Sequence, residues 1–501
     1  MTLGSPGFVL FAVVTLLACA ALGRRRRWLV LLVASGAFCA AAGSAAALAV
    51  LAGVALVSWG AALGVERYGE SARARWCFRA GVFGPLAVLL ASKYVGFVAG
   101  SVDTAAGWLG WPPPVGAVPI LAVLGVSYYV LQAIAYVVDV RDGVVPAERH
   151  LGRHALALAF FPKLIQGPIE RAEHLLPQLR DPRPLTLHDV AAGARLFVWG
   201  LFQKHVVADR LAPFVDAVYG DVHQHAGLPL LVATYLYAAQ LYFDFAGYTD
   251  MALGLARALG VRLTPNFAAP YLARSIADFW RRWHISLSSW LLDYVFKPLQ
   301  LGLRGWRTWG TPAALVVTFL ASGLWHGARW TFVAWGLLHG TYLAISALYR
   351  PYQRRVHGAL RLSGARVLPL AQVAWTFHLV CLSWIFFRAP SVADAAGAVT
   401  RLVAGLPATV AQAARGEDLD RLLYLGQGRS AFLAAIAAIG VGASLRAALR
   451  RIGALSSARD AEPAPAARLP IAYARTAVFA VLAYGIAVLG TAAQSFLYAR
   501  F

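Results

Sequence analysis

The feature that most constrains this chain is a series of apolar stretches, each long enough to cross a lipid bilayer. A helical crossing needs about 17–25 predominantly apolar residues, and stretches of this length recur along the whole sequence. Only 14% of the 501 residues are charged, whereas soluble domains carry about 25%. Because the apolar stretches leave no room for a water-soluble domain, we predict an all-α polytopic membrane protein that forms one integral membrane domain over residues 1–501.

The excess of positive charge, +22, has a distribution typical of membrane proteins. Arginines gather in short clusters at the ends of apolar stretches, as at Arg24–Arg27, which is the pattern of the positive-inside rule. A nucleic-acid-binding protein would gather them on one face, so we expect no nucleic-acid partner. The run Phe8–Leu22 has its positive charges after it, which predicts a first transmembrane helix rather than a signal peptide.

Placing the arginine-rich loops on one side of the membrane predicts the course of the chain. The first span then ends at Arg24–Arg27 on the cytoplasmic side, and Trp28–Leu63 is long enough for two spans. We expect outer loops at Ser101–Pro119 and Asp209–Gly227. The apolar piece Ala155–Gly167 is too short to cross, which favours a re-entrant or interfacial segment.

Two apolar runs, Pro312–Gly323 and Trp330–Ala347, flank a short polar turn that contains His326. Arginines at both outer ends of the pair predict a hairpin from the cytoplasmic side, with His326 at its tip deep in the membrane. Ionisable groups at that depth are costly and usually functional. Burial would keep this histidine neutral and available as a base. The alternative is a structural histidine bonded to a backbone carbonyl.

A second polar segment combines cations, aromatic rings and a histidine. Its candidate residues are Asp278, Arg281, Arg282, Trp283, His284 and Ser288. On a continuous helix Arg281, His284 and Ser288 would share one face, and Asp278 would be spaced for ion pairs with the arginines. Such a surface suits an anionic, nucleotide-bearing ligand. The alternative is an interfacial helix anchored by tryptophan and arginine.

Two isolated polar residues and several absent motifs complete the prediction. Asp244 ends an apolar span and Gln166 follows the short apolar piece; each would either line a site or mark the membrane interface. Glycine-rich phosphate loops, dinucleotide fingerprints and nucleophile elbows are absent from the sequence. The four cysteines lack metal-ligand spacing, so we expect no metal and no permanently bound cofactor. A buried neutral histidine beside a cationic surface fits acyl transfer from a thioester, in which a base takes the proton of the attacking hydroxyl.

A set of motifs in fixed order adds a family resemblance. The motifs are Gly125–Tyr129, Phe160–Ile169, Gly200–Lys204, Phe243–Met251, Asn266–Trp290, Trp325–Gly327 and Trp384–Arg388. Together they resemble the membrane-bound O-acyltransferase (MBOAT) family, in its alginate O-acetyltransferase branch. The resemblance covers about residues 125–388, with additional transmembrane helices expected in 1–124 and 389–501. The sequence departs from the family at Leu292, where an arginine is usual, and at Gln300–Leu303, where a glycine-rich loop is usual.

The resemblance implies a ring of transmembrane and re-entrant helices around a central funnel or tunnel, in the cell inner membrane. It implies that His326 is the catalytic histidine, that His284 is the second histidine, and that Trp325 lies beside them in the site. The donor would be acetyl-CoA or another acyl thioester from the cytoplasm. The acetyl group would pass to an extracytoplasmic, alginate-like polysaccharide through a periplasmic acetyltransferase partner. The alternatives are D-alanyl or other acyl transfer to teichoic acid, peptidoglycan or lipid, and non-enzymatic transport of a lipid-linked glycan.

Overall fold

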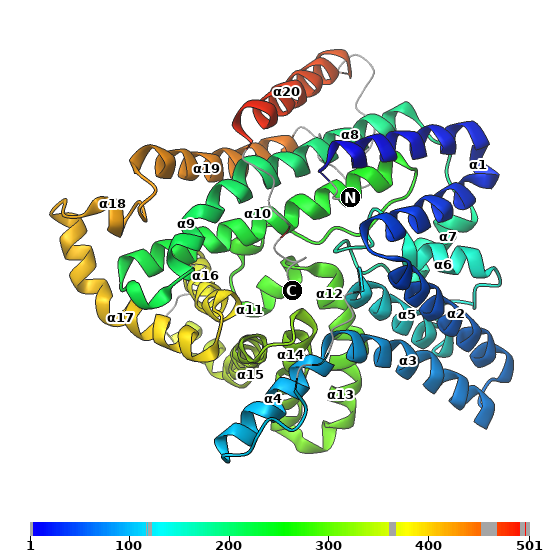
Figure 1. Ribbon diagram of the computed structural model, residues 1–501, viewed down its shortest axis with the longest axis horizontal. Helices are drawn as coiled ribbons and strands as arrows, with labels where there is room; N and C mark the ends of the chain where they lie inside the picture. The colour runs from blue at the N-terminus through cyan, green and yellow to red at the C-terminus, as the bar shows by residue number, and fades with distance from the viewer. Residues whose placement is uncertain are drawn as a thin grey trace. The chain divides into compact units, whose positions relative to one another are not determined.

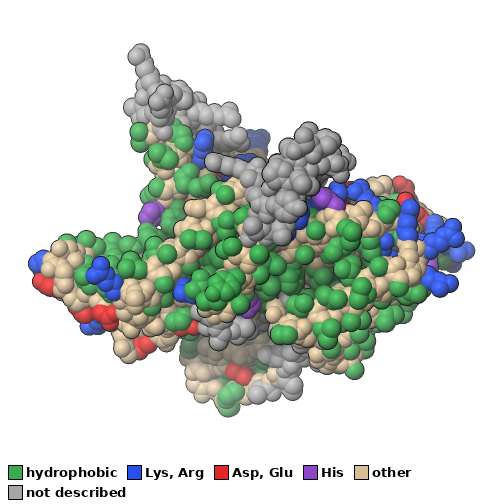
Figure 2. All heavy atoms as spheres, turned by 90° about the horizontal axis from the view of Figure 1, so that it is seen from above, with side chains coloured by type: hydrophobic (Ala, Val, Ile, Leu, Met, Phe, Trp, Pro, Cys, Tyr) green, Lys and Arg blue, Asp and Glu red, His purple; other side chains and the backbone are tan. Residues whose placement is uncertain are grey.

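The computed structural model describes residues 4–116, 118, 123–359, 367–451, 468–490 and 496. All regular elements in these residues are helical, and six helices are long and apolar enough to cross a membrane. The six are Pro6–Ala42 (α1), Ala45–Tyr68 (α2), Ala72–Lys93 (α3), the Trp330–Tyr349 part of α15 (Trp330–Ala359), Val367–Arg388 (α16) and the Arg429–Leu449 part of α19 (Arg429–Arg451). Hydrophobic side chains cover much of the face shown in Figure 2. The prediction of an all-α, multi-pass membrane protein is confirmed.

The chain divides into two compact units. The first contains the described residues up to Gly200 together with Tyr248–Pro265, and the second contains Leu201–Gly247 and the described residues from Asn266 onward. The predicted single domain over residues 1–501 and the predicted ring around a tunnel stay predictions.

The first unit is built from α1, α2 and α3 and from shorter helices that follow them. These are α4 (Val95–Trp108), α5 (Val126–Arg141), α6 (Leu151–Ala159), α7 (Ala172–Arg180) and most of α8 (Leu187–Phe202). Helices α2, α3 and α5 pack on one another, and α1 packs on α6 (Figure 1). Gly81 of α3 permits the close packing of α3 on α2 and α5, because a Cβ there would lie 2.6 Å from Ala61 of α2 and 2.9 Å from Val137 of α5. A larger side chain at this position would push the three helices apart.

The predicted end of the first span at Arg24–Arg27 is confirmed. Gly23, with φ 71°, is not helical and separates two helical halves of α1, and the arginines begin the second half directly, without a loop. Glycine adopts this φ without a steric penalty, so the chain turns back here, and the rings of Phe8 and Phe38 from the two halves lie 5.7 Å apart. The predicted cytoplasmic location of the arginines stays a prediction. Arg27 is buried and donates a hydrogen bond to the carbonyl oxygen of Arg183 at 2.6 Å. The Arg27 guanidinium therefore stabilises a contact inside the first unit.

The two predicted outer loops contain helices. Ser101–Pro119 begins inside α4, and Asp209–Gly227 contains α9 (Asp209–Tyr219) and the 3-10 turn η2 (Val222–Gln224). Helix α9 buries Leu211, Phe214, Val215 and Val218 on one face and exposes Pro213, Asp216 and Ala217 on the other. A short amphipathic helix of this kind has no long apolar run, so a search for apolar stretches does not detect it.

The second unit carries the histidine-bearing helices. It begins with π-helix η1 (Gln203–Ala208), α9 and the first part of α10 (Leu228–Ala258). The next elements are short: the 3-10 turn η3 (Pro270–Leu272), α11 (Ile276–Arg282), α12 (Ile285–Leu291), π-helix η4 (Leu292–Phe296), α13 (Lys297–Gly302) and the 3-10 helix η5 (Arg304–Trp309). They lead into α14 (Gly310–His326). Helices α15, α16, α17 (Val392–Ala414), α18 (Leu419–Leu422), α19 and α20 (Arg468–Leu489) follow.

Helices α14 and α15 form the predicted hairpin (Figure 1). Gly323 and Gly336 lie at their contact, where a Cβ on either glycine would collide with the backbone of the other helix. Glycines at a helix crossing let two backbones approach closely, as is common in membranes. His326 is the last residue of α14, so the hairpin fixes its position next to the turn.

Candidate active site

The imidazole of His326 is oriented by the helix that ends at it. Its Nδ1 lies 2.7 Å from the carbonyl oxygen of Ser322, one turn earlier in α14. A carbonyl oxygen accepts hydrogen bonds but does not donate them, so Nδ1 carries the proton and Nε2 carries the lone pair of the neutral ring. The residue is 4% exposed. The interpretation of His326 as a histidine bonded to a backbone carbonyl is therefore confirmed for Nδ1, and its role as a catalytic base through Nε2 stays a prediction.

Aromatic rings surround His326 on several sides. Its ring centroid lies 5.0 Å from that of Trp325, 4.8 Å from that of Trp335 and 5.6 Å from that of Phe387. These rings come from α14, α15 and α16. A surrounding of this kind excludes water, and a low local dielectric strengthens the electrostatic interactions of a reacting base. We call these rings, with His326 and His284, the histidine cage.

The predicted continuous helix through His284 is wrong. His284 has φ 45° and ψ 54° and separates α11 from α12. Arg281, His284 and Ser288 therefore do not share one face of a single helix. This left-handed conformation costs about 1–2 kcal/mol for a residue other than glycine and is retained only where the surrounding structure fixes it.

The segment around Asn266 fixes the backbone at His284. The Ile285 N–H donates to the carbonyl oxygen of Asn266 at 3.0 Å, and the Ala268 N–H donates to that of Arg282 at 3.0 Å. The Asn266 side-chain oxygen accepts from the N–H of Ser286 at 3.1 Å and from its hydroxyl at 2.7 Å. These four hydrogen bonds hold the chain on both sides of His284 and so set the direction of its ring.

The break brings His284 to the other histidine. The His284 and His326 ring centroids are 6.5 Å apart, and the rings are nearly perpendicular. Phe245 and Trp325 pack on His284 at 4.8 and 5.8 Å. Burial and, to a lesser extent, the nearby His326 lower the pKa of His284 well below its usual value. The structure thus joins Trp325, His284 and His326 in one buried group with His284 neutral at physiological pH.

Asp278 has a local structural role at the start of α11. Its backbone N–H is capped by the Ser275 hydroxyl at 3.1 Å, and its carboxylate accepts from the Arg274 N–H at 3.1 Å and from Arg282 Nε at 3.0 Å. Burial acts to raise the pKa of Asp278, but these hydrogen bonds and the arginine charges outweigh it, so the net pKa is lowered and the carboxyl is ionised. Arg281 is looser, with its guanidinium 3.7 Å from Asp278 and its side chain 74% exposed.

Three further predicted site residues have other surroundings. Trp283 is fully buried and stacks on Phe279 at 5.5 Å, and the Ser288 hydroxyl donates to the carbonyl oxygen of Trp283 at 3.0 Å. Asp244 is buried and accepts from Lys204 Nζ at 2.7 Å, and the same ammonium lies 2.7 Å from Asp209. These contacts stabilise the second unit. The predicted ligand-binding roles of these residues stay predictions.

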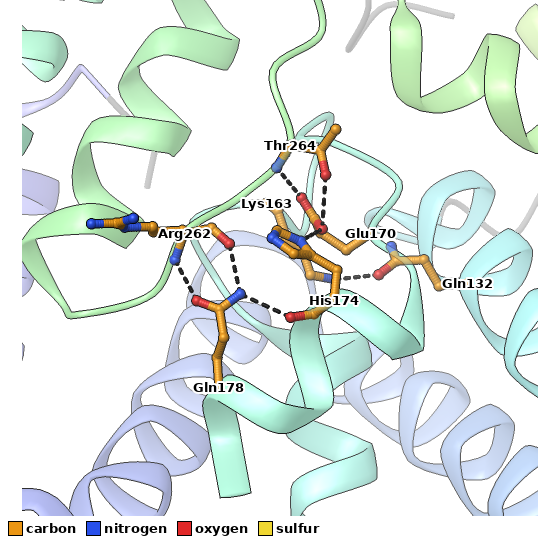
Figure 3. Close-up of polar contacts among 7 residues, drawn as sticks. All are labelled: Gln132, Lys163, Glu170, His174, Gln178, Arg262 and Thr264. Atoms are coloured by element: carbon orange, nitrogen blue, oxygen red, sulfur yellow. Dashed lines mark hydrogen bonds and ion pairs between the residues drawn. The ribbon is translucent and has the colours of Figure 1, made fainter. Parts of the chain in front are cut away.

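The remaining predicted residue, Gln166, is buried in the first unit. The same unit contains a polar cluster centred on Glu170 (Figure 3). The Glu170 side chain is fully buried and accepts from the Thr264 N–H, from the Thr264 hydroxyl at 3.2 Å and from His174 Nδ1 at 2.7 Å. Lys163 is buried nearby and donates to the side-chain oxygen of Gln132. The predicted role of Gln166 in binding substrate stays a prediction.

Sequence reasoning missed His339 as a neighbour of the catalytic candidate. Its Nδ1 accepts from the Trp280 indole N–H at 3.2 Å, so its Nε2 carries the proton and donates to the Ser383 hydroxyl at 2.9 Å. Trp335 lies between His339 and His326, with centroid distances of 5.0 and 4.8 Å. The spacing Trp335-x-x-x-His339 on one helix was the available signal, because residues four apart share a face. In the parts of the chain that the structure describes, no group of three potential ligands could hold a metal ion.

Comparison with known proteins gives a consistent result. The MBOAT, membrane-bound O-acyltransferase family, matches residues 156–388. A protein of Azotobacter vinelandii named "Probable alginate O-acetylase AlgI" is 41% identical over 320 residues, which are 64% of this chain and 60% of the relative. A Pseudomonas putida protein of the same name is 39% identical over 376 residues, 75% of this chain and 74% of the relative. The "Peptidoglycan O-acetyltransferase" of Helicobacter pylori is 34% identical, with 57% of each chain covered.

Proposed function

Because the chain belongs to the MBOAT, membrane-bound O-acyltransferase family, and with it to the acyltransferases, we propose that it moves acetyl groups from acetyl-CoA for the O-acetylation of an extracytoplasmic polysaccharide. The observation that carries this proposal is the tautomer of His326, whose Nδ1 is bonded to Ser322 and whose Nε2 bears the lone pair. The two relatives named as alginate O-acetylases support an alginate-like acceptor.

The proposed reaction uses His326 as a general base. Nε2 takes the proton of the attacking hydroxyl while the hydroxyl oxygen forms a bond to the carbonyl carbon of the thioester. The carbon–sulfur bond then breaks, and the departing thiolate receives the proton from His326, so that the products are an acetyl ester and free coenzyme A. His284, neutral and 6.5 Å away, would align the donor or the acceptor, since correct orientation lowers the barrier of a transfer step.

The donor also needs cations for its phosphate groups. Arg274, Arg281, Arg282 and Lys297 are the candidates in the second unit, and Arg282 is held in place by Asp278 at 3.0 Å. The proposal includes a location in the cell inner membrane, a cytoplasmic donor and a periplasmic acetyltransferase that receives the acetyl group.

The experiment measures coenzyme A release and transfer of radiolabel from acetyl-CoA by the purified protein in vesicles. His326→Ala should abolish both, whereas His223→Gln, at a histidine whose side chain is 65% exposed, should leave both unchanged. Unchanged turnover in His326→Ala would contradict the assignment of the base. Turnover of a D-alanyl carrier protein in place of acetyl-CoA would identify a D-alanyltransferase. Movement of a labelled lipid-linked glycan across the vesicle, without thioester turnover, would identify a transporter.

A further inference from the structure

The second unit contains an apolar pocket of about 320 Å³ that the proposed reaction does not use. Helices α11 and α12 form one wall through Trp280 and Ser288, and α14 and α15 form another through Phe319 and Leu343. Leu343 lies in the part of α15 that is long and apolar enough to cross a membrane. One wall of the pocket therefore belongs to a helix that is long and apolar enough to cross a membrane.

The polar atoms in the pocket wall are already bonded within the protein. The Trp280 indole N–H donates to His339 at 3.2 Å, the Thr318 hydroxyl donates to the carbonyl oxygen of Ala314 at 2.6 Å, and the Ser289 hydroxyl donates to that of Ser286 at 3.1 Å. A ligand with amides or hydroxyls would lose its hydrogen bonds to water on entry without gaining equivalent ones. A hydrocarbon chain has no such bonds to lose, so the pocket favours hydrocarbon.

The volume of the pocket matches part of a lipid chain. A cavity of about 150 Å³ in another protein holds one benzene molecule, which has six carbon atoms. By that measure about 320 Å³ holds roughly twelve carbon atoms, which is most of one acyl chain. The two pantetheine amides of coenzyme A would be poorly placed in the same space, for the reason given above.

The lining of the pocket carries one charge, and that charge is positive. Arg281 is the charged residue of the lining, its side chain is 74% exposed, and its ion pair with Asp278 is long at 3.7 Å. An exposed guanidinium in the lining of an apolar pocket is suited to a phosphate group with a hydrocarbon tail. We propose that this pocket binds one acyl chain of an anionic phospholipid, whose headgroup phosphate contacts Arg281.

The position of Trp280 gives this lipid a further role. Its ring lines the pocket on one side and packs on Trp335 on the other at 5.7 Å, and Trp335 packs on His326 at 4.8 Å. An acyl chain in the pocket fills the space behind Trp280 and keeps Trp280 packed on Trp335. Trp335 in turn is the ring that contacts His326. The lipid therefore stabilises the histidine cage from outside, while Arg274, Arg282 and Lys297 remain for the donor phosphates.

The test uses the full-length protein in vesicles that contain phosphatidylglycerol with a photoreactive group in one acyl chain. After illumination, mass spectrometry should locate the label on the segments that carry Phe319 and Leu343. Leu315→Trp fills the pocket and should reduce this label at least fivefold. Val317→Trp is the matched control on the same helix, because Val317 is 45% exposed and does not line the pocket; it should leave the label within twofold of the unmodified protein.

Competition tests the headgroup and does not depend on any pocket variant being folded. Unlabelled phosphatidylglycerol should displace the label from the unmodified protein several-fold more effectively than phosphatidylcholine. Arg281→Gln should reduce that preference about fivefold, and Arg281→Lys should retain most of it. Equal labelling of Leu315→Trp and the unmodified protein, or displacement of the label by acetyl-CoA, would overturn the proposal. Because lipid labelling needs no thioester turnover, its failure is distinguishable from a failure of the proposed acyltransferase activity.

Discussion

The Glu170 cluster of the first unit and the histidine cage of the second unit bury ionisable side chains in two different ways. In the first unit the Glu170 carboxylate is fully buried, but hydrogen bonds from Thr264 and His174 reach it. In the second unit His284 and His326 are buried among aromatic rings. A buried charge must be compensated by partners, whereas a neutral ring can be buried among other rings at little cost. The comparison teaches that the first cluster supports the fold and that the second can hold a base ready for reaction.

The largest expected effect tests the charged cluster. Glu170→Ala should lower the free energy of unfolding by about 3–5 kcal/mol, because it removes one partner of a buried, hydrogen-bonded charge group. Glu170→Gln keeps the shape and part of the hydrogen bonding and should cost clearly less. Thermal unfolding in detergent, followed by size-exclusion chromatography, measures both. Equal losses for the two variants would show that the charge of Glu170 is not what the cluster needs.

A smaller effect is expected from an uncharged polar group next to the histidine cage. His339 packs on Trp335 of the cage at 5.0 Å, and His339→Leu removes the acceptor of the Trp280 indole N–H and the donor to Ser383. Leaving a buried donor unsatisfied costs about 1–3 kcal/mol, which should appear in the same unfolding measurement. His339→Gln, which can replace part of this bonding, is the control. A loss for His339→Leu as large as that for Glu170→Ala would remove the distinction between the Glu170 cluster and the surroundings of the histidine cage.

The backbone at His284 gives a prediction that separates conformation from chemistry. His284→Gly and His284→Ala remove the same imidazole, but glycine tolerates a φ of 45° and alanine does not. The glycine variant should therefore be more stable than the alanine variant by about 1 kcal/mol. Both should lose acyl transfer to a similar extent. Greater stability of the alanine variant would mean that the left-handed turn at this residue is not retained.

The smallest expected effect is a pH dependence at the edge of the first cluster. The hydrogen bond to Glu170 raises the pKa of His174 above its ordinary value, against the opposing effect of burial. The folded-state pKa is the higher one, so the stabilisation is fully present below the unfolded-state pKa of about 6.5 and is lost as the pH rises through the folded-state value. The difference in melting temperature between the unmodified protein and His174→Gln should thus be larger at pH 5.5 than at pH 9. A difference that grows with pH would reverse the assignment.

Apolar length and order of motifs were enough to predict much of the fold. The sequence predicted an all-α membrane protein, a hairpin that ends at His326, and the spans that became α2, α15, α16 and α19. It also predicted that the first span ends at Arg24–Arg27, next to the break at Gly23. It failed at α9, because a short amphipathic helix has no long apolar run. It gave no sign that Arg27 is buried and bonded to the distant carbonyl oxygen of Arg183. Neither feature can be inferred from hydropathy.

The site was predicted in part. His326 and His284 were selected because titratable groups in apolar surroundings are costly and usually functional. The structure brings their ring centroids to 6.5 Å from each other. The prediction that Arg281, His284 and Ser288 share one face of a helix was wrong. Hydrogen bonds from the Asn266 segment, almost twenty residues earlier in the chain, break the helix at His284. Helical periodicity describes only neighbours within a few turns, so a break imposed by a tertiary contact cannot be inferred from it.

The bond between His326 and Ser322 has an evolutionary consequence. The group that orients this imidazole is a main-chain oxygen, which every amino acid supplies, so no single substitution at position 322 deletes it. Mutation can reach the orientation of the ring only by unwinding the last turn of α14, for example with a proline. Residue 322 is therefore free to vary in size and polarity as far as packing allows. The proton stays on Nδ1 of His326 as long as the last turn of α14 remains helical.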